Sequence, residues 1–127
     1  MDLRVLEGTY ALCRLDGGEP LPDWFAFDPP LSVAIRRGPD ELSLVFPDAR
    51  TPAGVDAARG WRALEIVGPL DLALTGITAE VATVLADADV AICPLATYDT
   101  DVILVQDDRL SDAAHALHAA GHTVTAA

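Results

Sequence analysis

The sequence predicts an α+β protein made of two ferredoxin-like modules in tandem. Each module has the order strand–helix–strand–strand–helix–strand, with its helices on one face of an antiparallel sheet. Three observations predict this fold class. The apolar pattern of the second half alternates between strand-like and helix-like segments in that order. The first half gives the same order more faintly. The two halves also repeat weakly at an offset of about 60 residues.

The repeat is clearest where residues 37–45 align with residues 97–105. The dipeptide Gly68-Pro69 is the only break between the halves, and no flexible linker separates them. The expected domain boundaries are residues 1–67 for the first module and residues 68–127 for the second.

The first module carries the weaker pattern. Strands are expected at residues 8–15, 31–36, 41–46 and 61–67. The turn Gly38-Pro39 separates the middle two strands. The proline-interrupted segment 20–30 has room for a single helical turn, and residues 52–59 form a candidate short helix with a proline in its first turn.

The second module has stronger signals. Strands are expected at residues 70–74, 90–95, 102–105 and 122–125. Thr75 is a suitable N-cap for the first helix, and Gly76 gives the preceding turn its freedom. Gly121 ends the second helix. Apolar residues recur at helical spacing at Ile77, Val81, Val84 and Leu85 in the first helix, and at Leu110, Ala114 and Leu117 in the second.

A polar loop, Thr97-Tyr98-Asp99-Thr100-Asp101, precedes the apolar run at residues 102–105. The loop contains two carboxylates and three hydroxyls. Because the run is short and rich in β-branched residues, it predicts a buried strand. The loop is therefore a tight turn whose last acid, Asp101, is fixed at the start of a rigid strand.

The composition excludes several classes of partner. Eight basic residues against 20 acidic ones give a formal net charge of −12, which repels nucleic acid and anionic membrane surfaces. No apolar run is long enough to span a membrane, and the first residues lack the pattern of a secretory signal. We therefore expect a cytoplasmic protein in which Cys13 and Cys93 are free thiols.

In this arrangement the chain resembles the ACT-domain family, most closely the tandem, aspartokinase-like pair also seen in the arginine-sensing CASTOR proteins. The matching pieces, in order over most of the chain, are Asp40-Glu41-Leu42-Ser43, Gly60-Trp61-Arg62, Gly68-Pro69-Leu70, Thr75-Gly76-Ile77 and Thr97-Tyr98-Asp99-Thr100-Asp101. The resemblance implies that amino acids bind at interfaces between modules and that occupancy is passed to a partner domain.

The two turns of the second module offer partners for both charged groups of an α-amino acid. The turn Thr75-Gly76-Ile77, at the start of a helix, presents unpaired N–H groups to a carboxylate. Asp101 is the candidate partner of the ammonium. Strand three of such a module pairs with strand one, so both turns lie at one end of the sheet. The predicted ligand-binding residues are Thr75, Gly76, Ile77, Thr97, Tyr98, Thr100 and Asp101.

A second, degenerate site is an open alternative in the first module. The repeat places Glu41 opposite Asp101, and the turn near Asp16-Gly17-Gly18 is also acidic and rich in glycine. The simpler interpretation of Glu41 is an exposed hairpin acid.

Catalytic and metal sites are not expected. His115 and His118 lie three residues apart, with no third ligand at a suitable spacing. Nucleophile-elbow, phosphate-loop, zinc and dinucleotide signatures are absent from the sequence. The sharpest enzymatic alternative pairs Asp99 with Asp101, but both lie in one tight loop, whereas acid–base pairs require contrasting environments. We expect no catalytic residue, no metal and no cofactor.

The expected function is therefore a regulatory, non-enzymatic protein that binds an amino acid. The ligand would lie at a module or subunit interface of a homodimer, and binding would be reported through the oligomeric state or a partner. The alternative is a structural or interaction module with a decayed ligand site. A Ser-Thr pair often opens the hairpin loop in the family that the chain resembles, and this chain has Ala96-Thr97 there.

Overall fold

The computed structural model describes residues 1–68, 70–71 and 76–126, and it assigns eight strands and two α-helices to them. This confirms the mixed α+β class. The chain divides into two compact units. We call Met1–Glu7 together with Arg62–Ala127 the α/β unit, and Gly8–Trp61 the β unit.

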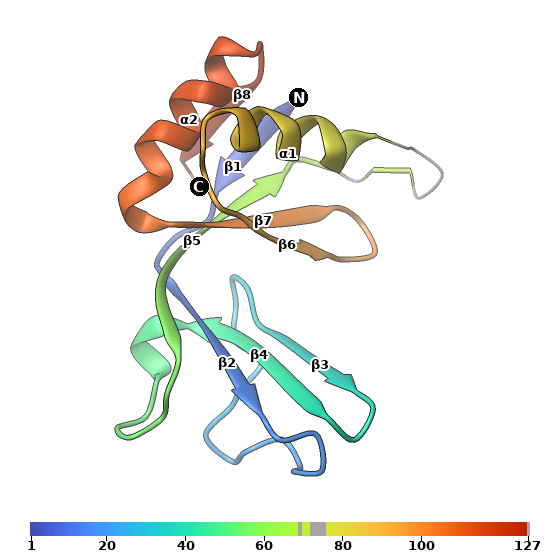
Figure 1. Cartoon of the computed structure of the whole chain (residues 1–127), viewed down its shortest axis with the longest axis vertical. Helices are drawn as coiled ribbons and strands as arrows, with labels where there is room; N and C mark the ends of the chain where they lie inside the picture. The colour runs from blue at the N-terminus through green and yellow to red at the C-terminus, as the bar shows by residue number, and fades with distance from the viewer. Residues whose placement is uncertain (69, 72–75, 127) are drawn as a thin grey trace. The chain divides into compact units, whose positions relative to one another are not determined.

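The α/β unit contains a five-stranded arrangement with two helices (Figure 1). Its elements are β1 (Asp2–Val5), the second part of β5 (Ala58–Ile66), α1 (Ile77–Asp87), β6 (Cys93–Ala96), β7 (Asp101–Gln106), α2 (Leu110–Ala119) and β8 (Thr123–Ala126). From β5 onward, the order is the predicted strand–helix–strand–strand–helix–strand. The strands lie side by side in the order β6-β7-β5-β1-β8.

Both helices pack on the same sheet face of the α/β unit, as Figure 1 shows. The core that they form with the strands comprises Leu3, Leu64, Ile66, Val81, Leu85, Val90, Ile103, Val105, Ala113 and Leu117. Val81 and Leu85 are the buried residues of α1, and Leu117 is buried in α2. The predicted apolar face of α1 therefore points toward the sheet, whereas α2 buries Ala113 together with Leu117 and leaves the predicted Ala114 only partly buried.

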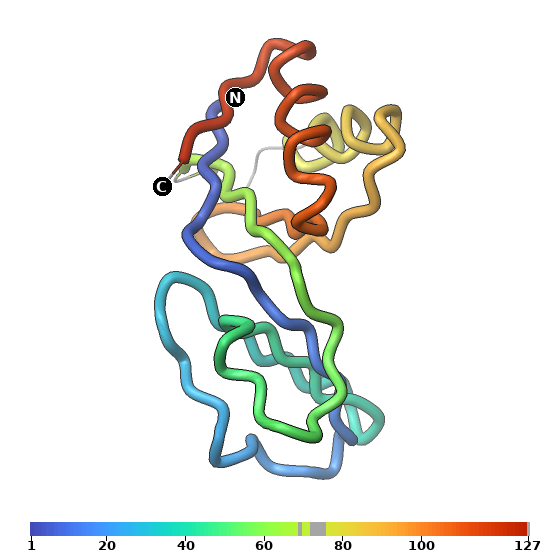
Figure 2. The backbone as a smooth tube through the Cα atoms, turned by 90° about the vertical axis from the view of Figure 1, so that its left-hand side faces the viewer, coloured from blue at the N-terminus to red at the C-terminus, as the bar shows by residue number. Residues whose placement is uncertain are grey.

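The strand content of the α/β unit differs from the prediction at two places. Residues 72–74 of the expected strand 70–74 lie outside the described residues, and the place of strand one is taken by β5. The strand β1 was not predicted. It runs antiparallel to β5 and parallel to β8, and Figures 1 and 2 show it between them. Only four residues form it, and their partners are distant in the sequence.

The β unit is an antiparallel sheet in the order β3-β4-β2-β5, to which β5 contributes its first residues. Its strands are β2 (Tyr10–Leu15), β3 (Val33–Arg37) and β4 (Glu41–Pro47), and a short 3₁₀ helix, η1 (Asp48–Arg50), follows β4. Its buried core comprises Ala11, Cys13, Leu42, Leu44 and Phe46. The ring of Trp24 packs edge-on against Phe46, with centroids 5.3 Å apart.

The predicted helix at residues 52–59 of the first module is wrong, whereas the single turn expected in segment 20–30 corresponds to a turn closed by a hydrogen bond from Phe25 N to Pro22 O at 3.0 Å. Residues 52–59 do not form a helix, because Gly54 turns the chain at a φ of +83° and β5 begins at Ala58. The segment 20–30 contains turns, and its prolines remove the N–H groups that helical hydrogen bonds require. The β unit, all of whose residues are described, therefore contains no α-helix.

The two units are not divided where the sequence places the boundary, between residues 67 and 68. The difference arises because β1 and the residues of β5 from Arg62 onward pair within the α/β unit. Across the described part of the chain, neither helix has both the length and the apolar character that crossing a membrane requires.

Candidate functional site

A cleft of about 250 Å³ opens in the α/β unit where the N-terminal turn of α1 meets the turn between β6 and β7. It is lined by Leu70, Asp71, Gly76, Ile77, Thr78, Ala79, Ala96, Thr97, Tyr98, Asp99, Thr100 and Asp101. Six of the seven predicted ligand-binding residues line this cleft together. The seventh, Thr75, lies outside the described residues.

The helix end in the cleft has no side-chain cap from its N-cap residue. Gly76 occupies that position in the left-handed region, at a φ of +81°, which favours glycine. The first helical hydrogen bond runs from Glu80 N to Gly76 O, at 2.9 Å. The N–H groups before Glu80 therefore have no partner in the helix, and together with the helix dipole they favour an anion.

The turn between β6 and β7 is held by its own threonines. Both the backbone N–H and the hydroxyl of Thr97 donate to Thr100 O, each at 2.8 Å. The Thr100 hydroxyl donates to Ile66 O at 2.6 Å, which ties the turn to the end of β5. These two hydroxyls therefore shape the turn. Tyr98 at its tip is 80% exposed.

A glycine allows the chain that leaves β5 to pass close to this turn. A Cβ atom on Gly68 would lie 2.9 Å from Leu70 N and 3.2 Å from Asp99 O. Leu70 N donates to that same Asp99 O at 2.7 Å. The close approach brings Leu70 into the lining of the cleft, so Gly68 is part of its construction.

Asp101, the first residue of β7, is half-buried at the bottom of the turn. Its Oδ2 accepts a hydrogen bond from the hydroxyl of Thr78, in the first turn of α1. No described residue forms a salt bridge with Asp101 or Asp99. The lining also includes Asp71, and its described residues include no lysine, arginine or histidine, so their side chains make the cleft negative.

Six lining residues are not among the predicted ligand-binding residues: Leu70, Asp71, Thr78, Ala79, Ala96 and Asp99. Thr78 and Ala79 directly follow Ile77, so the rule that the whole first turn of a helix faces the same end could have found them. Nothing in the local sequence indicates the contact between Thr78 and Asp101, which are 23 residues apart.

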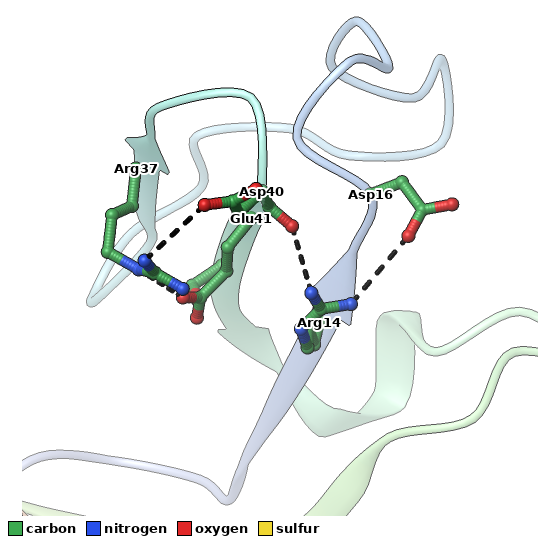
Figure 3. Close-up of polar contacts among 6 residues, drawn as sticks. Arg14, Asp16, Arg37, Asp40 and Glu41 are labelled. Carbon is green, nitrogen blue, oxygen red and sulfur yellow. Dashed lines mark hydrogen bonds and ion pairs between the residues drawn. The ribbon is translucent and has the colours of Figure 1, made fainter.

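The second candidate position, Glu41, is already engaged within the β unit (Figure 3). Arg37 Nε donates to Glu41 Oε1 at 2.7 Å, and the Ser43 hydroxyl donates to Oε2 at 2.6 Å. The hydrogen bonds from Ser43 and Arg37 lower the pKa of Glu41. Arg14 bridges the neighbouring turns, with a hydrogen bond to Asp40 O at 2.8 Å and an ion pair to Asp16 at 3.7 Å. The carboxylate of Glu41, which the repeat aligns with Asp101, is therefore already paired with Arg37.

The remaining reactive groups lie elsewhere. Burial raises the pKa of the Cys93 thiol, and burial together with the charge of Asp56 raises that of Cys13. A raised pKa disfavours the thiolate needed for nucleophilic attack. Among the described residues, no three His, Cys, Asp or Glu side chains are grouped so that they could hold a metal ion.

Comparisons with known proteins place this geometry in context. A family model described as ACT domain matches residues 56–119. A crystal structure of a protein from Agobacterium tumefaciens is 31% identical, with a TM-score of 0.90 over 99% of this chain and 92% of that one. A protein of unknown function from Vibrio cholerae, described as a possible transport protein, is 25% identical, with a TM-score of 0.74 over 93% and 88%.

A third solved structure shares the fold at lower identity. The ligand-free regulatory subunit of aspartate kinase from Thermus thermophilus is 14% identical, with a TM-score of 0.59 over 94% of this chain and 96% of that one. The comparison with curated proteins gives no match.

Proposed function

This chain belongs to the ACT-domain family, and we propose that it is a regulatory module that binds an α-amino acid in the cleft between α1 and the turn at residues 97–100. One observation carries the proposal. The N-terminus of α1 and the Asp101 carboxylate face one small cleft, and no described residue caps the first with its side chain or forms a salt bridge with the second. These are complementary to the two charges that every α-amino acid carries on one carbon.

In the proposed complex the ligand carboxylate accepts hydrogen bonds from the N–H groups of Gly76, Ile77 and Thr78. The ligand ammonium lies against Oδ1 of Asp101, which has no hydrogen-bond partner among the described residues. Leu70 and Ile77 provide apolar surface for the rest of the molecule. The proposed role is binding without catalysis and without a cofactor.

We further propose that a second copy of the chain covers this site. The turn that would contact the ligand is open to solvent at Thr97, Tyr98 and Asp99, so a ligand bound by one copy would remain partly hydrated. A homodimer would bury it, and binding would then be reported through the oligomeric state or through a partner.

The second candidate function is a structural module whose ligand site has decayed. It is favoured by Ala96, which lines the cleft and adds no hydroxyl to it. The hydroxyls of Thr97 and Thr100 also bond within the protein. The two functions differ in one respect, which is whether any amino acid stabilises the fold.

A thermal-shift screen of the twenty protein amino acids against the full chain decides between them. A ligand present at a hundred times its Kd stabilises the folded protein by about 2.7 kcal/mol, which raises the Tm of a protein of this size by about 10 °C. Asp101→Asn should abolish the shift, because it removes the charge that the ammonium requires. Asp108→Asn, at an exposed aspartate outside the cleft, is the matched control. A flat screen rejects the binding function, and a shift that survives in Asp101→Asn rejects the site.

A further inference from the structure

We propose that Thr78 is a positioning residue that sets the distance between the two charged halves of the cleft and thereby selects amino acids whose amine is on the α-carbon. The proposal rests on the function proposed above. It assigns a role to a side chain that the sequence pattern did not single out.

The contact that carries the proposal joins two elements. Thr78 is the second residue of α1, and Asp101 is the first residue of β7. The Thr78 hydroxyl donates to Asp101 Oδ2, and both side chains are half-buried and line the cleft. A hydrogen bond to a charged acceptor is stronger than one between neutral groups. It therefore holds the carboxylate at a fixed place relative to the helix end.

The hydroxyl of Thr78 has an alternative use, for which the described residues show no bond. Threonine near a helix start commonly bonds to local backbone, which stabilises the helix alone. Here the hydroxyl reaches across 23 residues to a strand. The hydrogen bond thus couples the N–H groups of the first turn, where the ligand carboxylate would bind, to the acid that would hold the ammonium.

Fixing that spacing has a consequence for selectivity. One oxygen of Asp101 is occupied by Thr78, and the other is left for the ligand. In an α-amino acid the carboxylate and the ammonium are attached to the same carbon. In its β-homologue they are attached to adjacent carbons, so the two charges lie farther apart. A rigid spacing that suits the first disfavours the second, because an immobile carboxylate cannot follow the displaced amine.

The test compares Thr78→Val with wild type, using calorimetric titration of the strongest amino acid from the screen and of its β-homologue. Valine has the shape of threonine and lacks the hydroxyl. We expect the affinity for the α-amino acid to fall about tenfold, the typical effect of losing a hydrogen bond to a charged group. The affinity for the β-homologue should stay within about twofold. The ratio of the two Kd values therefore shrinks, which a purely structural role of Thr78 would not cause.

Two further variants keep the test decisive. Thr78→Ser retains the hydroxyl and should restore both the affinity and the α-to-β ratio. Thr83→Val makes the same substitution at an exposed position of α1 that does not line the cleft, and it should bind as wild type does. If Thr78→Val fails to fold, Thr78→Ala is used in its place, and the ratio of the Kd values for the β-homologue and the α-amino acid should again fall.

Failure of this inference is distinct from failure of the proposed function. A wild-type protein that binds an amino acid, with a Thr78→Val variant of equal affinity and equal ratio, overturns the role of Thr78 alone. A wild-type protein that binds none of the twenty amino acids overturns the proposed function, and the role of Thr78 falls with it.

Discussion

Gly17 illustrates, at the scale of a residue, how closely the backbone packs beyond the end of β2. A Cβ atom there would lie 2.5 Å from Glu41 N and from the carbonyl carbon and oxygen of Pro39. These are backbone atoms of the turn between β3 and β4, so they cannot move aside cheaply. Gly18, the next residue, has no such neighbour within 4 Å. Close packing against backbone atoms therefore requires glycine at position 17, whereas position 18 has space for a side chain.

Gly17→Ala should lower the free energy of unfolding by roughly 2 kcal/mol, because the new methyl group would overlap backbone atoms of Pro39 and Glu41. Gly18→Ala, the matched control, should change it by less than about 1 kcal/mol and in the stabilising direction, because alanine restricts the unfolded chain. Urea denaturation at neutral pH measures both. Equal effects in the two variants would contradict this account of the turn.

Single residues of the candidate site differ in how far the sequence could predict them. Asp101 could be predicted to face the start of α1, because strand three pairs with strand one in this topology. The hydrogen bond from the Thr78 hydroxyl to Asp101 could not be predicted, because a contact between residues 23 positions apart does not affect the local apolar periodicity. The hydroxyls of Thr97 and Thr100 have partners in the turn, which only the folded geometry reveals.

At the scale of an element, the hairpin of β3 and β4 carries its own charge pair. Arg37 and Ser43 hold Glu41 by hydrogen bonds across the turn and along β4, and they lower the pKa of its carboxyl. A carboxyl with a lowered pKa in the folded state stabilises the protein above its unfolded pKa. That contribution is lost as the pH falls through the folded value.

Glu41→Gln should therefore be less stable than wild type at pH 7, and the difference should disappear as the pH falls below about 4.3, the ordinary value for glutamate. Urea unfolding across this pH range measures the difference. Glu19→Gln, at an exposed glutamate of the same unit whose side chain makes no salt bridge with any described residue, is the control and should show no such trend. A constant difference at all pH values would contradict the role of this ion pair.

Elements with a strong local pattern were predictable, and those defined by distant partners were not. Helices α1 and α2 and strand β7 follow their apolar periodicity. Strand β1 has four residues and is stabilised by β5 and β8. The expected helix at residues 52–59 began with a favourable proline, but the positive φ at Gly54 and the pairing of β5 overrode that preference.

At the scale of the whole molecule, charge is the dominant property. The formal net charge is −12, and the cleft is acidic as well, because its described lining has three aspartates and no basic side chain. A ligand with an additional positive charge is therefore attracted by both near and distant carboxylates. Salt weakens the distant contribution most, because the Debye length shrinks from about 10 Å at 0.1 M to about 3 Å at 1 M.

Arginine should accordingly raise the Tm more than citrulline, which has nearly the same shape and lacks the side-chain charge. We expect its affinity to be about three- to tenfold higher at low ionic strength, and we expect the gap to narrow in high salt. Thermal shifts at matched concentrations in two salt conditions measure this. A citrulline response equal to that of arginine would show that the negative charge of the cleft does not select the ligand.

The pairing of β1 with β8 has a consequence for synthesis. Strand β1 is hydrogen-bonded to β8, which is synthesised more than 100 residues later, with Asp2 opposite Thr123 and Val5 opposite Ala126. The β unit is continuous in the chain and is complete once Trp61 has emerged. The sheet that carries the cleft must instead wait for β8, while β1 remains tethered without its parallel neighbour. The sheet behind the proposed ligand site is therefore complete only after both helices and β8 have been synthesised.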